Sequence, residues 1–310
     1  MNPRSLSTKA DLSCFLQSQT NIFLAKFLPF SIYRCYLSLA GFYFYGVNGE
    51  ARRNLSKSLA YVLGGTIGRV RFVYVLLKTY LGIFEHYYEK MVNAHRSLAG
   101  MMKFLDTHVR ISGKAWLDEI HQQGRGCILV TGHFGAVEYV PLFLAASHYR
   151  PSIILRFKSE TLKQALAQKS NSVDLELIDA DSPNVIFKAL NALKQGRLLI
   201  TLCDEVHHWR PSKNEVVALF GRSIPKDRTL DILYRRSKVP ICFGAIQRLK
   251  NGYDLSIHPI ADGRQEISLC NASWRLLEQY VYQYPEQWYQ WPEFHSEISE
   301  YVMRQAAWAH

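Results

Sequence analysis

The chain has 310 residues, of which 48% are hydrophobic, and this length allows one large domain with a substantial buried core. Its 37 lysines and arginines outnumber its 26 aspartates and glutamates, and the net charge of +11 suits an anionic partner such as an acidic protein or an anionic membrane surface. The basic residues are scattered and accompany no nucleic-acid-binding motif, and the six cysteines form no C-x-x-C pair. We therefore expect no nucleic-acid partner, no disulfide framework and no cysteine-based zinc site.

Residues 1–108 are predicted to form an N-terminal region of helices, which begins with a loose polar tail over residues 1–20. Residues 22–46 form an aromatic-rich apolar run that is long enough to cross a bilayer, although Pro29 and Arg34 interrupt it. Such an interrupted run favours helices that lie in or on a membrane interface.

A second apolar stretch, residues 72–84, is shorter and contains Lys78, and an amphipathic helix is predicted from residue 85 to residue 105. We expect the two apolar stretches to associate with a membrane through aromatic belts and basic anchors. A hydrophobic helical subdomain that packs on the rest of the protein explains the same pattern equally well. The sequence does not decide whether residues 22–46 span the bilayer.

From residue 109 onward, strands and helices alternate, and this predicts an α/β domain over residues 109–310 with a mixed, mostly parallel sheet flanked by helices. The predicted strands are residues 127–131, 152–156, 173–178, 198–202, 239–248 and 252–259. The predicted helices are residues 114–122, 160–169, a segment between Ser182 and Gly196, residues 266–283 and a last segment beyond residue 293. Asn251-Gly252 is typical of a hairpin turn, and the glycine turn at Gly221 is predicted to enter a helix through Pro225.

The most informative segment runs from Gly132 to Glu138 and follows the predicted buried strand at residues 127–131. The loop beyond the carboxyl end of a strand is where open α/β sheets bind their ligands, and the small residues Gly132 and Gly135 let a substrate approach the backbone. If the loop folds back, Glu138 can hold one imidazole nitrogen of His133 and leave the other nitrogen as a base. The alternative is that both residues are ordinary surface or capping residues.

Two further predicted strands end in polar residues. Arg156 ends one of them, and Asp204 follows the strand at residues 198–202. A basic group beside carboxylates suits an anionic or hydroxyl-bearing substrate, although Arg156 taken alone is more simply a surface residue. His207 and His208 follow closely, but they show no metal-binding spacing, so we expect neither a metal site nor a redox cofactor.

The sequence resembles the lipid A biosynthesis lauroyl/myristoyl acyltransferase family, within the wider lysophospholipid acyltransferases. Those proteins carry a histidine, four residues and then an acidic residue, which here are His133 and Glu138. The resemblance runs in order from about residue 45 to residue 292, and its other segments are Arg52-Arg53-Asn54-Leu55, Gly113, Gly124-Arg125-Gly126, Arg156, Asp204, Phe220-Gly221, Ile224-Pro225 and Tyr284-Pro285-Glu286-Gln287-Trp288.

The resemblance implies a glycerol-phosphate-acyltransferase-like fold that transfers a fatty acyl group from a thioester on acyl carrier protein to a hydroxyl of a membrane lipid or glycolipid. It implies a place on the cytoplasmic face of the bacterial inner membrane, as a peripheral or singly anchored protein. His133 would be the catalytic base, and Glu138 would hold the imidazole tautomer. The residues implied in substrate binding are Gly132, Gly135, Arg156, Asp204, Phe220 and Gly221.

Two other functions fit the same residues. A lipid esterase would use His133 and Glu138 with water as the acceptor, and a membrane lipid-binding protein could retain the scaffold of an acyltransferase without its activity. The sequence does not fix the acceptor lipid, the acyl chain length, the choice between acyl carrier protein and coenzyme A, or the oligomeric state.

Overall fold

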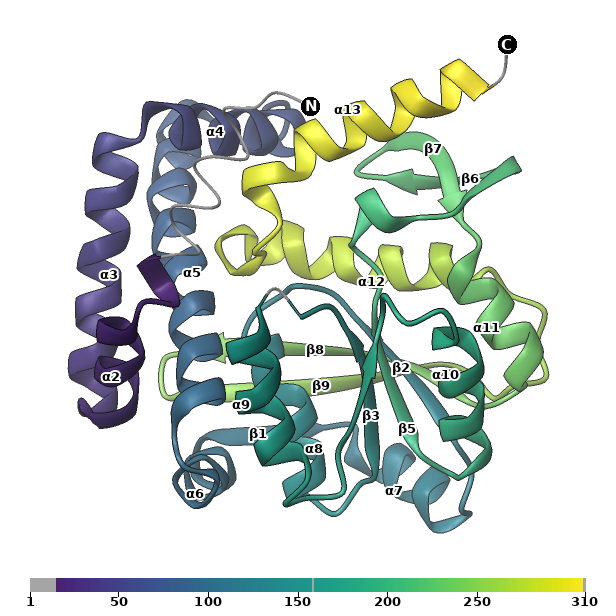
Figure 1. Ribbon diagram of the computed structural model, residues 1–310. Coiled ribbons are helices and arrows are strands. Elements are labelled where there is room, and N and C mark those ends of the chain that lie inside the picture. Colours follow the sequence, from purple (N-terminus) through teal and green to yellow (C-terminus); the bar gives the residue numbers. More distant parts are fainter. Residues whose placement is uncertain (1–14, 158, 309–310) are drawn as a thin grey trace.

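A seven-stranded mixed sheet forms the centre of the fold, and helices cover it (Figure 1). The computed structural model describes residues 15–157 and 159–308. In spatial order, the strands are β1 (Val109–Ser112), β9 (Gly252–Ala261), β8 (Ile241–Leu249), β2 (Cys127–Thr131), β5 (Leu198–Leu202), β3 (Pro151–Leu155) and β4 (Glu176–Asp179). A separate antiparallel hairpin joins β6 (Pro211–Leu219) to β7 (Arg222–Asp227).

Five neighbouring strands of the sheet, from β8 to β4, run parallel to one another. Strand β9 pairs with β8 in the antiparallel sense, and β1 runs parallel to β9 at the edge. The register of β2 on β5 pairs Cys127 with Leu198 and Thr131 with Leu202, so these two strands end at the same level. The loops after β2, β5, β3 and β4 therefore meet along one edge of the sheet.

Helices precede the sheet, alternate with its strands and follow it. They are α2 (Gln19–Phe27), α3 (Phe30–Val47), α4 (Gly49–Leu63), α5 (Arg69–His95), α6 (Leu98–His108), α7 (Lys114–Gln122), α8 (Val140–Ala146), α9 (Glu160–Ser170), α10 (Val185–Lys194), α11 (Thr229–Ser237), α12 (Leu269–Gln283) and α13 (Trp291–Trp308). Short 3₁₀ turns lie at η1 (Val137–Tyr139), η2 (Val206–His208) and η3 (Pro285–Gln287).

The helices α2, α3 and α5 stand side by side on one flank of the sheet (Figure 1). The apolar run at residues 22–46 is divided at Pro29, which lies between α2 and α3 and disfavours a helical conformation at the residue before it. Glycine allows close packing here, because a Cβ on Gly41 of α3 would lie 2.6 Å from the ring of Phe84. Among the described residues, no helix has both the length and the hydropathy needed to cross a membrane.

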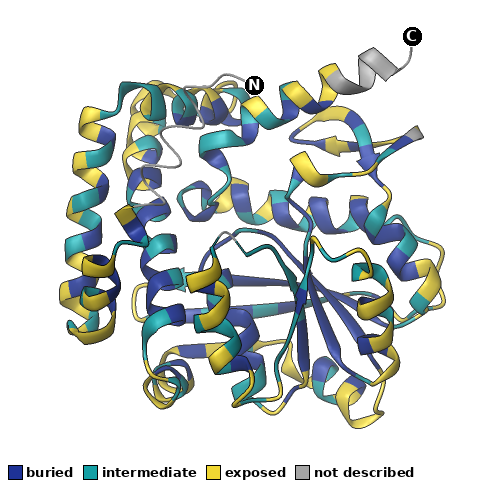
Figure 2. Cartoon of the chain, in the orientation of Figure 1, coloured by how far each residue is buried: buried dark blue, intermediate teal, exposed yellow. Residues whose placement is uncertain are grey.

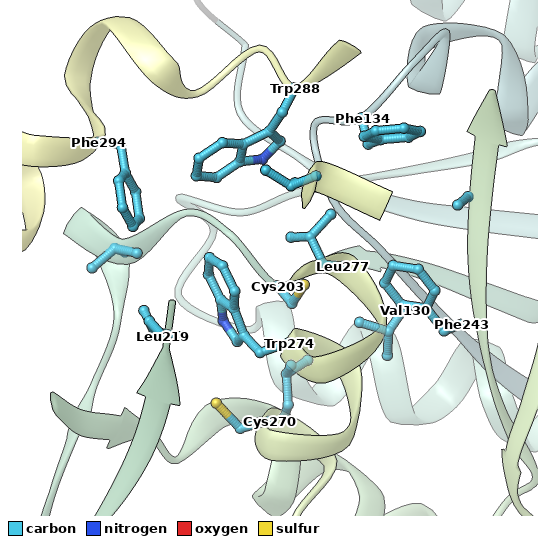
Figure 3. Close-up of a cluster of buried hydrophobic side chains, with 14 of the residues drawn as sticks. Val130, Phe134, Cys203, Leu219, Phe243, Cys270, Trp274, Leu277, Trp288 and Phe294 are labelled. Carbon is cyan, nitrogen blue, oxygen red and sulfur yellow. The ribbon is translucent and has the colours of Figure 1, made fainter. Parts of the chain in front are cut away.

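The sheet separates two hydrophobic clusters, because alternate residues of each strand point to opposite faces. In β2, Ile128 and Val130 belong to the cluster formed with α10, α11 and α12, whereas Cys127 and Leu129 belong to the cluster formed with α6, α7 and α8. Figure 3 shows part of the first cluster, and Leu277 lies between the two tryptophans, Trp274 and Trp288, and the pair Val130 and Phe243. The strands are accordingly buried along much of their length (Figure 2).

Both clusters also contain residues from before residue 109. Tyr45 and Leu55 belong to the first cluster, and Tyr33 and Leu37 belong to the second. The predicted boundary between residues 108 and 109 therefore marks the change from helices to alternating strands and helices, but the buried packing is continuous across it.

The predicted α/β class and mostly parallel sheet are confirmed, and β2, β5 and α7 have the predicted bounds. The predicted strand at residues 173–178 is observed as β4, Glu176–Asp179, and the helix predicted from residue 266 begins at Leu269. Three further predictions differ more from the structure. The loose tail was predicted to reach residue 20, but Ser18 already caps α2, and residues 1–14 lie outside the described part of the chain. The helix predicted over residues 85–105 is divided, because Arg96 is extended and Ser97 caps α6.

The third difference concerns the glycine turn. Pro225 lies in strand β7, and the next helix begins only at Thr229. Phe220 and Gly221 both have positive φ values, of 48° and 76°, and they form the tight turn of the β6–β7 hairpin. The proline is tolerated in this strand because a two-stranded hairpin leaves one side of each strand without a neighbouring ladder.

Candidate active site

The loop that follows β2 is held by hydrogen bonds along its backbone. The N–H of His133 donates to Asp204 Oδ2, and the N–H groups of Phe134, Gly135 and Ala136 donate to backbone carbonyls. Every backbone N–H from residue 133 to residue 136 therefore has an acceptor within the protein.

Gly135 makes this arrangement possible. Its φ is +58°, and a Cβ at this position would lie 1.6 Å from the carbonyl oxygen of Ile246 on β8. Gly132 is also confined, since a Cβ there would lie 2.8 Å from Leu277 and 3.2 Å from Asp204 Oδ2. Gly135 is thus required for the loop to pack against β8, whereas a Cβ on Gly132 would have to displace the Leu277 side chain of α12.

The imidazole of His133 pairs with Asp204, which follows the neighbouring strand β5. His133 Nδ1 lies 2.9 Å from Asp204 Oδ1, and the other carboxylate oxygen also accepts from Trp288 Nε1 at 2.8 Å. The carboxylate is completely buried. Because an ionised carboxylate only accepts hydrogen bonds, this contact favours the tautomer with the proton on Nδ1 and leaves Nε2 as the basic nitrogen.

The pKa of His133 reflects two opposing influences. Burial alone would lower this pKa, but the negative charge of Asp204 and its hydrogen bond raise it, with smaller contributions from Glu205 and Glu138. The net result is a pKa above the ordinary value of 6.5. The surroundings therefore make His133 a stronger base than a histidine in water.

The Glu138 carboxylate faces α5 and does not form the predicted hydrogen bond to His133. Its Oε1 lies 3.4 Å from His86 Nε2 and 3.5 Å from Lys90 Nζ. The backbone carbonyl of Glu138 accepts from Asn93 Nδ2 at 2.8 Å. The acid that holds the imidazole is thus Asp204, which the sequence placed only among the substrate-binding residues.

A cavity of about 520 Å³ opens beside these groups. His133, Glu138, His86 and Lys90 lie along its polar wall. Its apolar wall is formed by residues of α8, β3, α9, β4 and β5, namely Pro141, Leu142, Ile153, Leu155, Leu162, Leu166, Leu177, Ile200 and Leu202. Reactive polar groups and a long apolar surface therefore share one cavity of the size that proteins use for small ligands.

Arg156 directly follows β3 and lines the same cavity. Its guanidinium is already paired, with Nε 3.0 Å from Asp181 and Nη1 3.0 Å from Glu205. These partners follow β4 and β5, so the arginine joins three strand ends. Its positive charge is largely balanced before any substrate binds.

Phe220 and Gly221 do not line the cavity. Phe220 is buried and packs against the rings of Trp274, Trp288 and Trp291. Through Trp288, which donates to Asp204, this cluster supports the carboxylate that holds His133. The position of Phe220 suits a supporting role in the packing behind the site.

Several cavity residues were not identified from the sequence. Gln290 Nε2 lies 2.9 Å from His133 Nδ1, and the ring of Tyr289 stacks on that of His86 with centroids 3.9 Å apart. His86 and Lys90 lie on α5, in a stretch where the sequence shows an amphipathic helix and no motif. The spacing of four residues places His86 and Lys90 on one face of the helix, and this could be read from the sequence. The sequence did not indicate which element that face would contact.

No group of residues in the described part of the chain is arranged to hold a metal ion. His207 and His208 lie in η2 near the cavity, and His207 Nδ1 pairs with Glu297 at 3.2 Å. Burial and the neighbouring His207 lower the pKa of His208 to about 4. Both histidines line the cavity.

Comparison with known proteins identifies one family. The family model for bacterial lipid A biosynthesis acyltransferase matches residues 14–292, a range that includes His133, Asp204 and Glu138. A search of curated proteins finds no match.

Proposed function

Because the chain belongs to the bacterial lipid A biosynthesis acyltransferase family and is therefore an acyltransferase, we propose that His133 is the general base of its reaction. The substrates in this proposal are a fatty acyl thioester and a hydroxyl group of lipid A or a related membrane glycolipid. The observation that carries the proposal is the pairing of His133 with the buried Asp204 at the wall of a large, partly apolar cavity.

In the proposed reaction, Nε2 of His133 accepts the proton of the acceptor hydroxyl while the hydroxyl oxygen attacks the thioester carbonyl carbon. The tetrahedral intermediate then collapses, the carbon–sulfur bond breaks, and the leaving thiolate takes the proton from the imidazolium. The new ester and a free thiol are the products, and His133 returns to its neutral form. Asp204 stabilises the imidazolium that forms between the two steps.

The apolar wall of the cavity suits the hydrocarbon chain of the acyl group. Leucines and isoleucines of β3, β5 and α9 line the same cavity as the polar residues. Burying each methylene group of an acyl chain contributes about 0.8 kcal/mol to binding. We propose that this surface binds the acyl chain while the thioester carbonyl lies beside His133.

The acyl donor in this proposal is acyl carrier protein. An acidic carrier suits a chain with a net charge of +11. Coenzyme A thioesters present the same reactive group, so the carrier is distinguished by measuring both donors.

We propose that the protein acts at the cytoplasmic face of the bacterial inner membrane, which its N-terminal helices contact. Between residues 15 and 84, Glu50 is the single acidic residue, and the basic residues are Lys26, Arg34, Arg52, Arg53, Lys57, Arg69, Arg71 and Lys78. The same helices expose large apolar side chains, including Ile32, Leu39, Tyr43 and Val47 along one stripe of α3. A basic region with exposed apolar side chains suits an anionic lipid surface.

A labelled-donor assay tests the proposed function. The protein is incubated with acyl carrier protein or coenzyme A that carries a labelled acyl chain, together with lipids from bacterial membranes. The proposal predicts labelled glycolipid and a preference for the carrier protein. Labelled free acid without acylated lipid would identify an esterase, and the absence of both products would support a non-catalytic lipid-binding protein.

A further inference from the structure

Acyl transfer places negative charge on the carbonyl oxygen of the thioester, and hydrogen-bond donors or cations usually stabilise that charge. The backbone N–H groups of residues 133–136 belong to the same loop as the base. All four donate to Asp204 or to backbone carbonyls of the protein. They are therefore not available to a substrate without breaking the hydrogen bonds that hold the loop.

Among the described residues, three lysine and arginine side chains line the cavity, and two of them already bind other groups of the protein. Arg156 is held by two carboxylates. Lys169 donates to the carbonyl of Asn93 at the carboxyl end of α5, where a cation interacts favourably with the helix dipole, and burial lowers its pKa to about 8. The third is Lys90, which lies half-buried beside the Glu138 carboxylate.

We propose that Lys90 is a further catalytic residue, whose ammonium group stabilises the oxyanion of the tetrahedral intermediate, and that Glu138 positions it. This inference rests on the function proposed above. The ammonium group of Lys90 has three N–H donors, and its contact with the Glu138 carboxylate, at 3.5 Å, uses one of them. The other N–H groups can therefore donate to a substrate.

The contacts of α5 support this assignment. His86, Lys90 and Asn93 are spaced by four and three residues, so they lie on one face of the helix. All three contact Glu138, the first two at its carboxylate and the third at its backbone carbonyl. The acid of the His-x4-Glu motif is therefore fixed against α5, on the side of the cavity where the lysine lies.

In this arrangement the two carboxylates of the site have different roles. Asp204 fixes the tautomer of the base, and Glu138 holds the ammonium group of Lys90 in place at the cavity wall. Removal of a single oxyanion donor from an acyl-transfer enzyme typically costs about 100- to 1,000-fold in kcat.

Substitutions at Lys90 test the proposal. We expect Lys90→Met to lower kcat by about 100-fold or more with little change in KM, and Lys90→Arg to restore part of the loss because it restores a cationic donor. The pH profile of the remaining activity should keep the ionisation of His133, because Asp204 still holds the ring. Lys90→Gln, which retains a polar side chain of similar length, serves as a second variant if Lys90→Met fails to fold. The matched control is Lys188→Met, since Lys188 is exposed on α10 away from the cavity, and its kcat should not change.

A double-mutant cycle with Glu138→Gln tests the positioning role. If Glu138 acts through Lys90, the double variant should be about as slow as Lys90→Met alone. If the two losses multiply, Glu138 acts independently of Lys90, and the positioning role would be overturned. Wild-type kcat in folded Lys90→Met would overturn the catalytic role. If His133→Ala is inactive in that case, the proposed function stands without Lys90.

Discussion

At the scale of single residues, the site depends on a contact between side chains that are 71 positions apart in the sequence. His133 and Asp204 follow adjacent parallel strands that end at the same level, so their side chains meet beyond the edge of the sheet. The carboxylate has three hydrogen bonds from His133 and Trp288 and no exposure to solvent. Its charge therefore acts on the imidazole with little screening by water.

The variant Asp204→Asn tests this contact through the pH dependence of the reaction. A general base must be neutral to act, so kcat/KM should rise with pH through the pKa of His133, which lies above 6.5 in the wild-type protein. Removing the negative charge lowers that pKa, so the rising limb should move to lower pH while the maximal rate falls by about 100-fold or more. A rising limb at the wild-type pH would show that Asp204 does not set the basicity of His133.

At the scale of elements, the loop after β2 is clamped between α5 and β8. Arg248 of β8 forms a two-pronged ion pair with the buried Glu89 of α5, at 2.7 and 2.8 Å, and also donates to the carbonyl of Gly135 at 2.7 Å. The N–H of Ala136 donates to the carbonyl of Ile246 on the same strand. The helical N-terminal region therefore fixes the position of the loop that carries His133.

A pair of glycine substitutions tests how closely this loop must approach β8. Gly135 and Gly221 both have positive φ values, but a Cβ on Gly221 would meet no atom within 4 Å, whereas one on Gly135 would meet Ile246 at 1.6 Å. Gly221→Ala should lower the free energy of unfolding by about 1–2 kcal/mol, which is the conformational penalty for alanine at a positive φ. Gly135→Ala should lower the free energy of unfolding by more than about 4 kcal/mol or abolish folding. If chemical denaturation showed equal decreases in the free energy of unfolding for the two variants, the loop could move away from the strand.

At the scale of the whole molecule, the N-terminal helices contribute to the buried core and also present an exposed apolar and basic surface. Leu39 and Tyr43 are 64% and 72% exposed on α3, while Leu37 of the same helix is fully buried. One side of α3 thus packs on α5 and the opposite side is open to a partner.

Binding to lipid vesicles tests whether that partner is a membrane. We expect the wild-type protein to bind vesicles that contain an anionic phospholipid, and Leu39→Asp/Tyr43→Asp to bind at least about tenfold more weakly because it adds charge where apolar atoms would be buried. The control is Phe187→Asp on α10, where Phe187 is 74% exposed and lies outside the N-terminal helices. Similar vesicle binding by the wild type and the α3 variant would contradict a membrane-binding role for this face.

Local patterns in the sequence predicted much of the fold. The buried runs of β2 and β5 and the start and stop signals of α7 and α9 gave bounds that agree with the structure to within one residue. The β6–β7 hairpin was missed because a proline after a glycine turn is also typical of a helix start. Whether this segment forms a strand depends on tertiary packing, which a local sequence pattern does not specify.

The candidate site was only partly predictable for the same reason. The place of His133 follows from the strand before it, but its partner depends on the spatial order of the strands. That order puts β5 beside β2, although β3 and β4 come between them in the sequence. The contacts of Glu138 with His86 and Lys90 depend on the docking of α5, which no motif in the sequence indicates.

The rate of acyl transfer by His133→Ala, measured beside its unfolding midpoint, tests the central claim most directly. We predict that the variant folds with a midpoint close to that of the wild type, because the side chain lies at the cavity wall and contributes little to the core. Its kcat should fall by about 100- to 10,000-fold, the usual contribution of a positioned acid or base. A folded His133→Ala variant that transfers acyl groups at the wild-type rate would contradict the proposed mechanism.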